Sequence, residues 1–280
     1  MKYKMVCIDM DGTLLGKKKK ISEINKEIRN RAHDKGVEIV VTTGRLYNNA
    51  AYFSKLLGVN SPVIAANGAI VIDQKTNEII YERDIPKEQC LKIYDILTKY
   101  KLPFHFHTTK TIYCNNWMSK IGTQIYMTKQ VYTEDLNIEY ETVSSRNRWI
   151  DIFEKENGFM AKCITFSTKS KKIAKAREEL QKLGILTLFA SGTHSLEINF
   201  NGVSKGNAVK ALIEKYGIKR EELICIGDNE NDISMLQFAG VSVAMGNAIK
   251  EVKEIADYVT DTNKNNGVAK AIEKFILKEN

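Results

Sequence analysis

Short apolar runs alternate with amphipathic segments through the first third of the chain. The apolar runs are typical of strands buried on both faces, and they lie at residues 4–8, 37–42 and 62–66. Helical patterns occupy residues 23–35 and 48–57, and Ser22 stands where an N-cap is expected before the first of them. This order predicts a parallel sheet with right-handed crossovers.

The pattern changes near residue 84 and returns near residue 201. The intervening stretch starts with a helix opened by Pro86, continues with a hairpin at 104–114, and ends with strands and a charged helix after residue 162. Its middle, residues 116–162, gives no readable pattern. From residue 202 the alternation of helix and strand resumes. We therefore expect an α/β core of residues 1–83 and 201–280, interrupted by an α+β module of residues 84–200.

Polar residues stand where the predicted core strands end. They are Asp9 and Asp11, Thr43 and Gly44, Asn67 and Gly68, and residues 228–232 from Asp228 to Asp232, with Lys205 at the start of the helix that follows the insert. In a parallel α/β sheet, ligands bind at the carboxyl ends of the strands. The sequence therefore predicts that these polar groups form one site.

The pair Asp9 and Asp11 suggests phosphoryl chemistry. Their side chains point the same way, because residues two apart share one face of a strand, and their like charges favour a hard divalent cation such as Mg²⁺. Asp9 is ionised at neutral pH without a partner base, so it suits a nucleophile that forms an aspartyl-phosphate. Asp11 is placed to give a proton to the leaving group and to take one from water afterwards.

The other polar groups supply charge and hydrogen-bond donors. Asp228 offers the cation a second anionic oxygen. Asp232 is expected to support this metal site without binding the ion itself. Thr43 offers a hydroxyl, the Gly44 backbone N–H is open to close approach, and Lys205 offers a positive charge to the oxygens of a phosphoryl group. Fixed donors of this kind are what phosphoryl transfer requires.

Composition narrows the class of protein. Hydrophobic residues make up 43% of the 280 residues, enough for packed cores, and no apolar run approaches the roughly 18 residues of a membrane span. The five cysteines are scattered, and the N-terminus has no secretory pattern, so we expect a reduced, cytoplasmic protein. The net charge of +8 has a single dense block, at residues 17–20. That block is expected to be a solvated loop, with attraction of anionic substrates as the alternative.

Four segments in a fixed order resemble the motifs of the haloacid dehalogenase superfamily. They are DMDGTL at 9–14, TGR at 43–45, GVSKG at 202–206 and GDNEND at 227–232. The chain is most similar to the Cof-type phosphatases of subfamily IIB, which it also resembles at ANGA (66–69), VAMGNA (243–248) and NNGVA (265–269). The resemblance implies a Rossmann-like core with an inserted C2-type cap, which selects the leaving group.

The resemblance also assigns roles to the site residues. It implies that Asp9 is the nucleophile and a Mg²⁺ ligand, and that Asp11 is the acid and base and binds the metal through its backbone carbonyl. It implies that Asp228 is the second carboxylate ligand. The groups implied to hold the phosphoryl group are Thr43, Gly44 and Lys205, with Asn231 contacting either that group or the substrate.

The leading hypothesis is a Mg²⁺-dependent phosphatase of a small phosphorylated metabolite, such as a sugar phosphate or a cofactor-type phosphate. The alternative is a phosphomutase, which uses the same two acids but keeps water from the phosphoenzyme. A non-catalytic relative would be expected to lack at least one of the motif residues, and none is missing. Nucleic-acid binding is suggested by the net charge alone, and no membrane partner is expected.

Three groups outside these motifs are open to two interpretations. His105 and His107 are expected to face solvent as a pair, with recognition of the leaving group as the alternative. Arg45 is expected to be a structural or rim cation, with a direct substrate contact as the alternative. A pocket-lining role is the less favoured interpretation for three residues of the insert, Arg146, Arg148 and Trp149.

Overall fold

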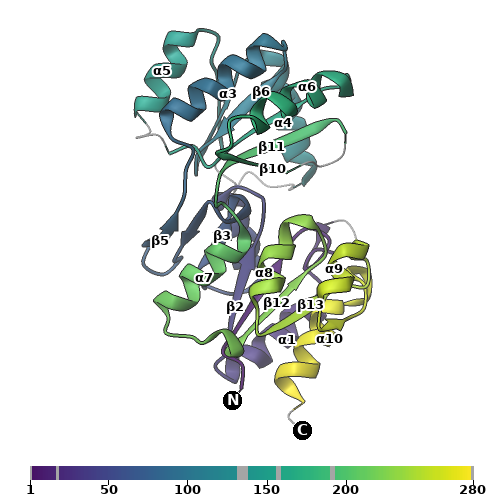
Figure 1. The fold of residues 1–280 in the computed structure, drawn as a ribbon. Helices are drawn as coiled ribbons and strands as arrows, with labels where there is room; N and C mark the ends of the chain where they lie inside the picture. The colour runs from purple at the N-terminus through teal and green to yellow at the C-terminus, as the bar shows by residue number, and fades with distance from the viewer. Residues whose placement is uncertain (1, 17–18, 131–137, 156–158, 190–192, 279–280) are drawn as a thin grey trace. The chain divides into compact units, whose positions relative to one another are not determined.

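A computed structural model of the chain describes residues 2–16, 19–130, 138–155, 159–189 and 193–278. It divides into two compact units (Figure 1): Met1–Glu82 with Ser204–Asn280 form the core unit, and Arg83–Val203 form the inserted unit. The change in sequence pattern placed these boundaries at 84 and 200. Lys17 and Lys18 of the basic block lie outside the described residues, and so does Ala190, the last residue of a strand that the sequence predicts at 186–190.

The core unit is built on one sheet in the order β14-β13-β12-β1-β2-β3-β4-β5. The six strands from β14 to β3 pair in parallel, and β4 and β5 continue as an antiparallel hairpin. The strands are β1 (Met5–Asp9), β2 (Glu38–Thr42), β3 (Val63–Ala65), β4 (Ile70–Ile72), β5 (Ile79–Glu82), β12 (Leu223–Gly227), β13 (Val241–Ala244) and β14 (Tyr258–Val259). The predicted parallel sheet is confirmed.

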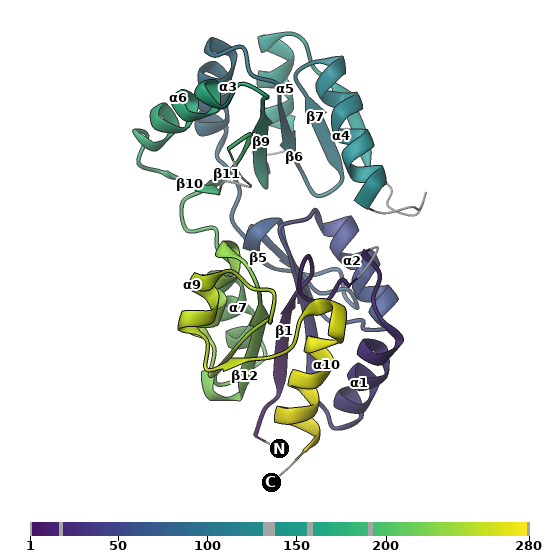
Figure 2. The same cartoon turned by 90° about the vertical axis from the view of Figure 1, so that its right-hand side faces the viewer.

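Helices cover both faces of this sheet, which is why β1 and β12 are buried along their whole length. One group of neighbouring helices is α1 (Glu23–Asp34), α2 (Tyr47–Leu57) and α10 (Gly267–Ile272), and the other is α7 (Lys205–Lys215), α8 (Ile233–Phe238) and α9 (Lys250–Ile255). Figure 2 shows the two groups on opposite sides of β1. The Ser22 hydroxyl accepts the Asn25 N–H and caps α1 as predicted.

Two expectations drawn from the composition concern the cysteines and membrane-spanning segments. All five cysteines are buried and free. In the described part of the chain, no helix is both long and apolar enough to cross a membrane.

The inserted unit has its own six-stranded sheet, in the order β10-β11-β9-β6-β7-β8. Every neighbouring pair is antiparallel except β7 and β8. The elements are α3 (Lys87–Lys99), β6 (Phe104–His107), β7 (Thr111–Cys114), α4 (Trp117–Gln130), β8 (Glu139–Thr142), α5 (Arg146–Lys155), β9 (Lys162–Phe166), α6 (Ser170–Gln181), β10 (Leu186–Phe189) and β11 (Ser195–Phe200).

The hydrophobic core of the inserted unit lies on one face of its sheet. Phe104 and Phe106 of β6 pack there against helices α3, α5 and α6, and Trp149 is buried among them. Helix α4 lies against β6, β7 and β8 on the opposite side of the sheet (Figure 2). The stretch that had no readable pattern therefore contains α4, β8 and α5.

Two sets of side chains in this unit concern interpretations that the sequence leaves open. His105 and His107 are 5% and 4% exposed, so the expected solvent-facing pair is wrong: both rings lie on the side of the sheet where α4 packs. Arg146 and Arg148 form exposed ion pairs within the unit, with Asp95 and Glu141 respectively.

Candidate active site

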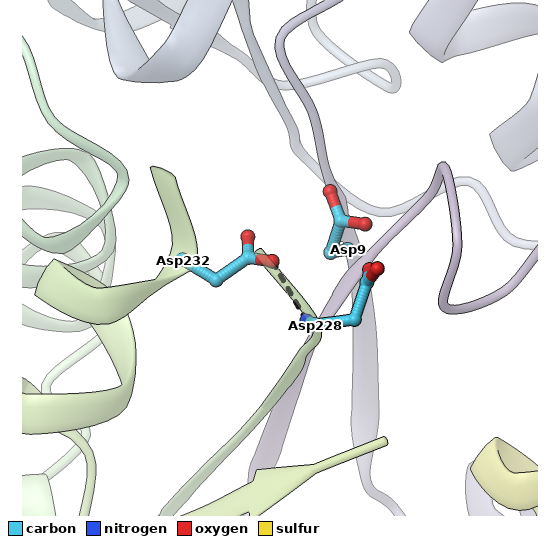
Figure 3. Close-up of side chains that lie close together, drawn as sticks. All are labelled: Asp9, Asp228 and Asp232. Atoms are coloured by element: carbon cyan, nitrogen blue, oxygen red, sulfur yellow. Dashed lines mark hydrogen bonds between the residues drawn. The ribbon is translucent and has the colours of Figure 1, made fainter. Parts of the chain in front are cut away.

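Three carboxylates of the core unit meet at the carboxyl ends of two central strands. Strand β1 ends at Asp9, and β12, its parallel neighbour, ends one residue before Asp228. One oxygen from each of Asp9, Asp228 and Asp232 falls within a group whose members are all within 4.8 Å of one another (Figure 3). The predicted metal site needs Asp9 and Asp228 to lie close enough to share an ion, and their oxygen atoms lie within that distance.

The turn after β1 brings the loop onto Asp228. Gly12 has φ +87°, and a Cβ there would lie 2.3 Å from an Asp228 carboxylate oxygen, so only glycine fits. The next residue, Thr13, donates its hydroxyl to Asp228 Oδ1 at 2.7 Å. Gly12 therefore allows the loop after Asp9 to touch the second acidic loop, residues 228–232.

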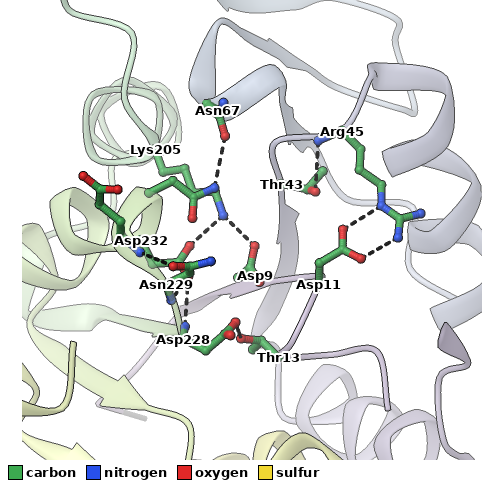
Figure 4. Close-up of polar contacts among 12 residues, drawn as sticks. Asp9, Asp11, Thr13, Thr43, Arg45, Asn67, Lys205, Asp228, Asn229 and Asp232 are labelled. Carbon is green, nitrogen blue, oxygen red and sulfur yellow. Dashed lines mark hydrogen bonds and ion pairs between the residues drawn. The ribbon is translucent and has the colours of Figure 1, made fainter. Parts of the chain in front are cut away.

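Lys205 is the positive charge within this cluster. Its side chain is fully buried at the start of α7, and Nζ lies 2.5 Å from Asp9 Oδ1 and 2.6 Å from Asp232 Oδ1 (Figure 4). Burial disfavours the charged ammonium, but Asp232 and Asp9 outweigh that effect and raise the pKa of Lys205 above its ordinary value. Lys205 is therefore a permanent cation that fixes one oxygen of Asp9.

Asp232 holds the second acidic loop in shape. Its Oδ2 accepts the backbone N–H groups of Asp228 and Asn229 at 2.9 and 3.0 Å, while Oδ1 pairs with Lys205. Both oxygens are thus already bound by the protein. This geometry agrees with the supporting role that was expected for Asp232.

The electrostatics of the cluster favour a cation. Burial, followed by repulsion from Asp232, raises the pKa of Asp9 well above its ordinary value, although Lys205 acts in the opposite direction. Burial also raises the pKa of Asp228 to about 6, against the lowering effect of the Thr13 hydrogen bond. An all-carboxylate donor set of this kind suits a hard divalent ion such as Mg²⁺, which Asp9 and Asp228 are placed to bind.

The Asp11 side chain is held apart from this cluster. Arg45 binds it with two parallel hydrogen bonds, from Nε to Oδ2 at 2.6 Å and from Nη2 to Oδ1 at 2.5 Å. Arg45 is itself anchored, since Nη1 donates to Asn49 Oδ1 and the guanidinium lies over the Phe53 ring. Arg45 was expected to be a structural or rim cation, with a direct substrate contact as the alternative, and neither interpretation included this pairing with the predicted acid.

The predicted phosphate-binding residues lie around the same strand ends. Thr43 is buried directly after β2, and its carbonyl accepts the Asn67 N–H at 3.0 Å. A Cβ on Gly44 would lie 2.6 Å from Asn67 Oδ1, so this loop also needs glycine. Asn231 Nδ2 donates to the same Asn67 oxygen at 3.1 Å, which links the TGR loop to the second acidic loop.

Two asparagines near the C-terminus hold the loop of the first motif. For Asn247 the sequence leaves a simple helix entry and a site-shaping role equally open, whereas Asn263 is not among the predicted residues. Asn247 donates from Nδ2 to the Gly12 carbonyl and accepts the Asn263 N–H, both at 2.8 Å. Asn263 donates its side-chain amide to the Leu15 carbonyl. Together they hold the loop that follows Asp9. Asn247 lies in the VAMGNA segment, which resembles the family pattern, whereas Asn263 lies two residues before the NNGVA segment, and only the fold shows which loop the two side chains contact.

Comparison with known proteins identifies the family. Residues 6–272 match the family model described as haloacid dehalogenase-like hydrolase. The chain is 31% identical to the 5-amino-6-(5-phospho-D-ribitylamino)uracil phosphatase YcsE of Bacillus subtilis, over 98% of this chain and 96% of the relative. It is also 31% identical to the phosphatase YwpJ of the same organism, over 95% and 97% of the two chains.

Solved structures agree with the sequence relatives. A haloacid dehalogenase-like hydrolase from Bacteroides thetaiotaomicron superposes with a TM-score of 0.83 at 30% identity, over 98% of this chain and 99% of the other. The HAD subclass IIB sugar phosphatase BT4131 gives a TM-score of 0.75 at 26% identity, over 97% and 98%. The chain belongs to the haloacid dehalogenase-like hydrolases. Within that family it is a phosphatase, a phosphoric monoester hydrolase of the Cof type.

Proposed function

We propose that the protein is a Mg²⁺-dependent phosphatase that hydrolyses a small phosphorylated metabolite through an aspartyl-phosphate on Asp9. The observation that supports this most directly is the convergence of Asp9, Asp228 and Asp232 around the single ammonium of Lys205. The relatives named for activity on a ribitylaminouracil phosphate and on sugar phosphates support a small phosphorylated substrate.

Asp9 is the carboxylate best suited to attack phosphorus. Asp232 uses both of its oxygens to hold Lys205 and two backbone N–H groups, and Asp228 accepts the Thr13 hydroxyl. In the first step an Asp9 oxygen bonds to phosphorus, the bond to the leaving oxygen breaks, and a proton from Asp11 goes to that oxygen. In the second step water gives its proton to Asp11 and attacks phosphorus, which releases phosphate and regenerates Asp9.

The remaining residues stabilise charge and position groups. Bound between Asp9 and Asp228, with the Asp11 carbonyl as the further protein ligand expected from the family, a magnesium ion would offset the negative charge of the phosphoryl oxygens. Lys205, Thr43, Gly44 and Asn231 are proposed to bind the phosphoryl group. A hydrogen bond to a charged group contributes about 1.5–3 kcal/mol, so several such donors are needed together.

The pairing of Asp11 with Arg45 fits its second role. The carboxylate that accepts two guanidinium hydrogen bonds is the form that takes a proton from the attacking water. Donation of a proton in the first step requires that Asp11 be protonated and turn from Arg45 towards the leaving oxygen. We therefore propose that Arg45 positions Asp11 between the two steps.

The inserted unit, expected at 84–200, is proposed to select the leaving group. The core unit supplies the proposed nucleophile, metal ligands and phosphoryl-binding groups from motifs that resemble those of the family, so discrimination between substrates is expected to come from elsewhere in the chain. The sequence of this unit matched the family only in length, position and order of elements.

The decisive experiment combines two variants with a product assay. With p-nitrophenyl phosphate and Mg²⁺, Asp9→Asn should lower turnover by at least about three orders of magnitude, and Asp11→Asn should slow both steps and leave phosphoenzyme behind. Asp34→Asn, at an exposed position of α1, is the matched control. Substantial turnover by pure Asp9→Asn protein would remove Asp9 as the nucleophile. Transfer of phosphate to a second hydroxyl, instead of release as free phosphate, would favour the phosphomutase.

A further inference from the structure

The segment Ala66–Gly68, directly after β3, has positive φ at three successive residues. The values are +51° at Ala66, +62° at Asn67 and +93° at Gly68. Residues other than glycine rarely adopt such values, and alanine and asparagine hold them here side by side. A strained backbone of this kind persists where the surrounding contacts fix it, and it is found most often at functional sites. The segment lies in the predicted site, yet none of the implied catalytic or binding roles falls on it.

Two successive backbone N–H groups of this segment hold the TGR loop. Ala66 donates its N–H to the Arg45 carbonyl at 2.8 Å, and Asn67 donates its N–H to the Thr43 carbonyl at 3.0 Å. In an extended strand, successive N–H groups point to opposite sides. The positive φ values are therefore what allows both groups to reach the same loop.

Gly68 brings the same segment against the start of α7. A Cβ at Gly68 would lie 2.3 Å from the Ser204 carbonyl oxygen and 3.0 Å from the Lys205 backbone nitrogen. Only glycine allows so close an approach of two backbones. The segment is thus packed against the first residue of the helix that carries the buried ammonium of the site.

The Asn67 side chain adds a contact that the turn itself does not need. Glycine would meet the backbone geometry with less strain, as Gly68 does. The side chain is only 3% exposed, and its Oδ1 accepts the Asn231 Nδ2 at 3.1 Å (Figure 4). The same oxygen lies where a Cβ on Gly44 would be 2.6 Å away. Asn67 therefore connects the TGR loop to the second acidic loop through one buried oxygen.

This contact determines the direction of the Asn231 amide. An amide nitrogen carries two N–H groups, and the planar amide fixes the angle between them. Once one N–H of Asn231 is bound to Asn67, the direction of the second one is set. A donor that is oriented in advance needs no reorganisation when negative charge develops on a phosphoryl oxygen.

We propose that Asn67 is a positioning residue of the phosphatase reaction, which acts through Asn231. It accepts one N–H of the Asn231 amide and so holds the second N–H towards the oxygens of the phosphoryl group. The strained backbone of residues 66–68 keeps Asn67 in place between the loops that carry Thr43, Lys205 and Asn231. This inference rests on the proposed phosphatase function and names the residue that orients one of its phosphoryl-binding groups.

The test is a double-mutant cycle in the full-length protein, with kcat/KM for p-nitrophenyl phosphate in Mg²⁺ as the measured quantity. Asn67→Gly removes the amide and suits the backbone, so it should melt within about 3 °C of the wild type and lower kcat/KM at least about tenfold. Asn231→Ala should lower kcat/KM by at least as much. The double variant should lose no more than about twofold beyond Asn231→Ala, because the group through which Asn67 acts is already gone.

Asn77→Gly is the matched control. Asn77 is an exposed asparagine of the core unit with φ +59°, so the same substitution is made there in the same backbone conformation and outside the site. Its kcat/KM should stay within about twofold of the wild-type value. An equal loss of kcat/KM in Asn77→Gly and Asn67→Gly would overturn the assignment.

Asn67→Asp supplies a second measurement if Asn67→Gly does not fold. Aspartate tolerates the same backbone conformation and keeps an acceptor oxygen, but it adds a negative charge beside Asn231. The inhibition constant of inorganic phosphate in Mg²⁺ should therefore rise at least about tenfold. A constant within about twofold of the wild-type value would place Asn67 too far from the phosphoryl group to orient a donor to it.

The outcomes separate this inference from the proposed function. Suppose that the wild-type protein hydrolyses p-nitrophenyl phosphate. Full activity in Asn67→Gly, or single-variant losses that multiply in the double variant, would then overturn the role of Asn67 alone. Wild-type protein without activity on any phosphate ester would overturn the proposed function and this inference with it.

Discussion

Replacing Asp9 by asparagine should stabilise the metal-free protein while it abolishes catalysis. The change removes one negative charge and keeps the size of a side chain that is only 5% exposed. Two unit charges 4.8 Å apart, the upper limit in this cluster, repel by about 3.5 kcal/mol at an effective dielectric constant of 20. Asp9 has two such neighbours, Asp228 and Asp232.

Lys205 opposes that repulsion. At 2.5 Å its attraction for Asp9 is about 6.6 kcal/mol on the same scale, close to the combined repulsion of the two aspartates. Burial, followed by the repulsion from Asp232, outweighs Lys205 and raises the pKa of Asp9 well above its model-peptide value of 3.8. At pH 7 this raised pKa cannot lower the free energy of unfolding by more than about 4.4 kcal/mol, because Asp9 takes up a proton before the cost of its charge exceeds that value. We expect Asp9→Asn to raise the free energy of unfolding by about 1–4 kcal/mol.

The assay is thermal unfolding in EDTA and in Mg²⁺. In EDTA the variant should melt several degrees above the wild type, at about 2–4 °C per kcal/mol, and Mg²⁺ should raise the melting temperature of the wild type more than that of the variant. A raised carboxyl pKa costs stability only above the unfolded-state value, so the difference should shrink as the pH falls towards 4. Asp34→Asn, at an exposed position, should change stability by no more than about 0.5 kcal/mol. A variant no more stable than the wild type in EDTA would refute the electrostatic account of the site.

Three further outcomes follow from the same contacts. Protons compete with the cation at Asp228, whose pKa is raised to about 6, and at Asp9, whose pKa is raised well above its ordinary value. The affinity for Mg²⁺ measured by calorimetry should therefore fall at least about tenfold per pH unit below pH 6. Arg45→Lys should lower kcat about tenfold or more with little change in KM, because lysine cannot form the two parallel hydrogen bonds to Asp11; an unchanged kcat would argue against positioning. Gly12→Ala should weaken Mg²⁺ binding at least about tenfold, because its Cβ would collide with Asp228, and wild-type affinity in a folded variant would contradict the close approach.

The core of the fold was predictable from the sequence because its strands are short apolar runs that end in polar residues. A strand buried on both faces has a distinct pattern, and the rule that parallel strands bind ligands at their carboxyl ends then brings Asp9, Thr43 and Asp228 together without any knowledge of loops. The structure places all three at such ends, as expected. Topology alone therefore determined most of the candidate site.

The contacts that the sequence did not predict depend on the direction of a side chain and on which helix packs over a given face of a sheet. Whether Arg45 points to solvent or to Asp11 is a choice of rotamer, and its anchors, Asn49 and Phe53, lie on the following helix. The burial of His105 and His107 depends on what covers their face of the sheet. Alternation with the two phenylalanines of β6 places them opposite the core, but α4, which packs on that side, comes from the stretch whose pattern was unreadable.

The net charge of the cluster explains why a divalent ion suits this site. Asp9, Asp228 and Asp232 contribute three negative charges, and Lys205 returns one positive charge, so two negative charges remain uncompensated within a few ångströms. A monovalent cation would leave the cluster with a net negative charge that repels a phosphate dianion. A divalent ion would make the cluster neutral before the substrate arrives. The buried lysine, whose ammonium lies between Asp9 and Asp232, would thus set the charge that a bound metal has to carry, in addition to holding the proposed nucleophile.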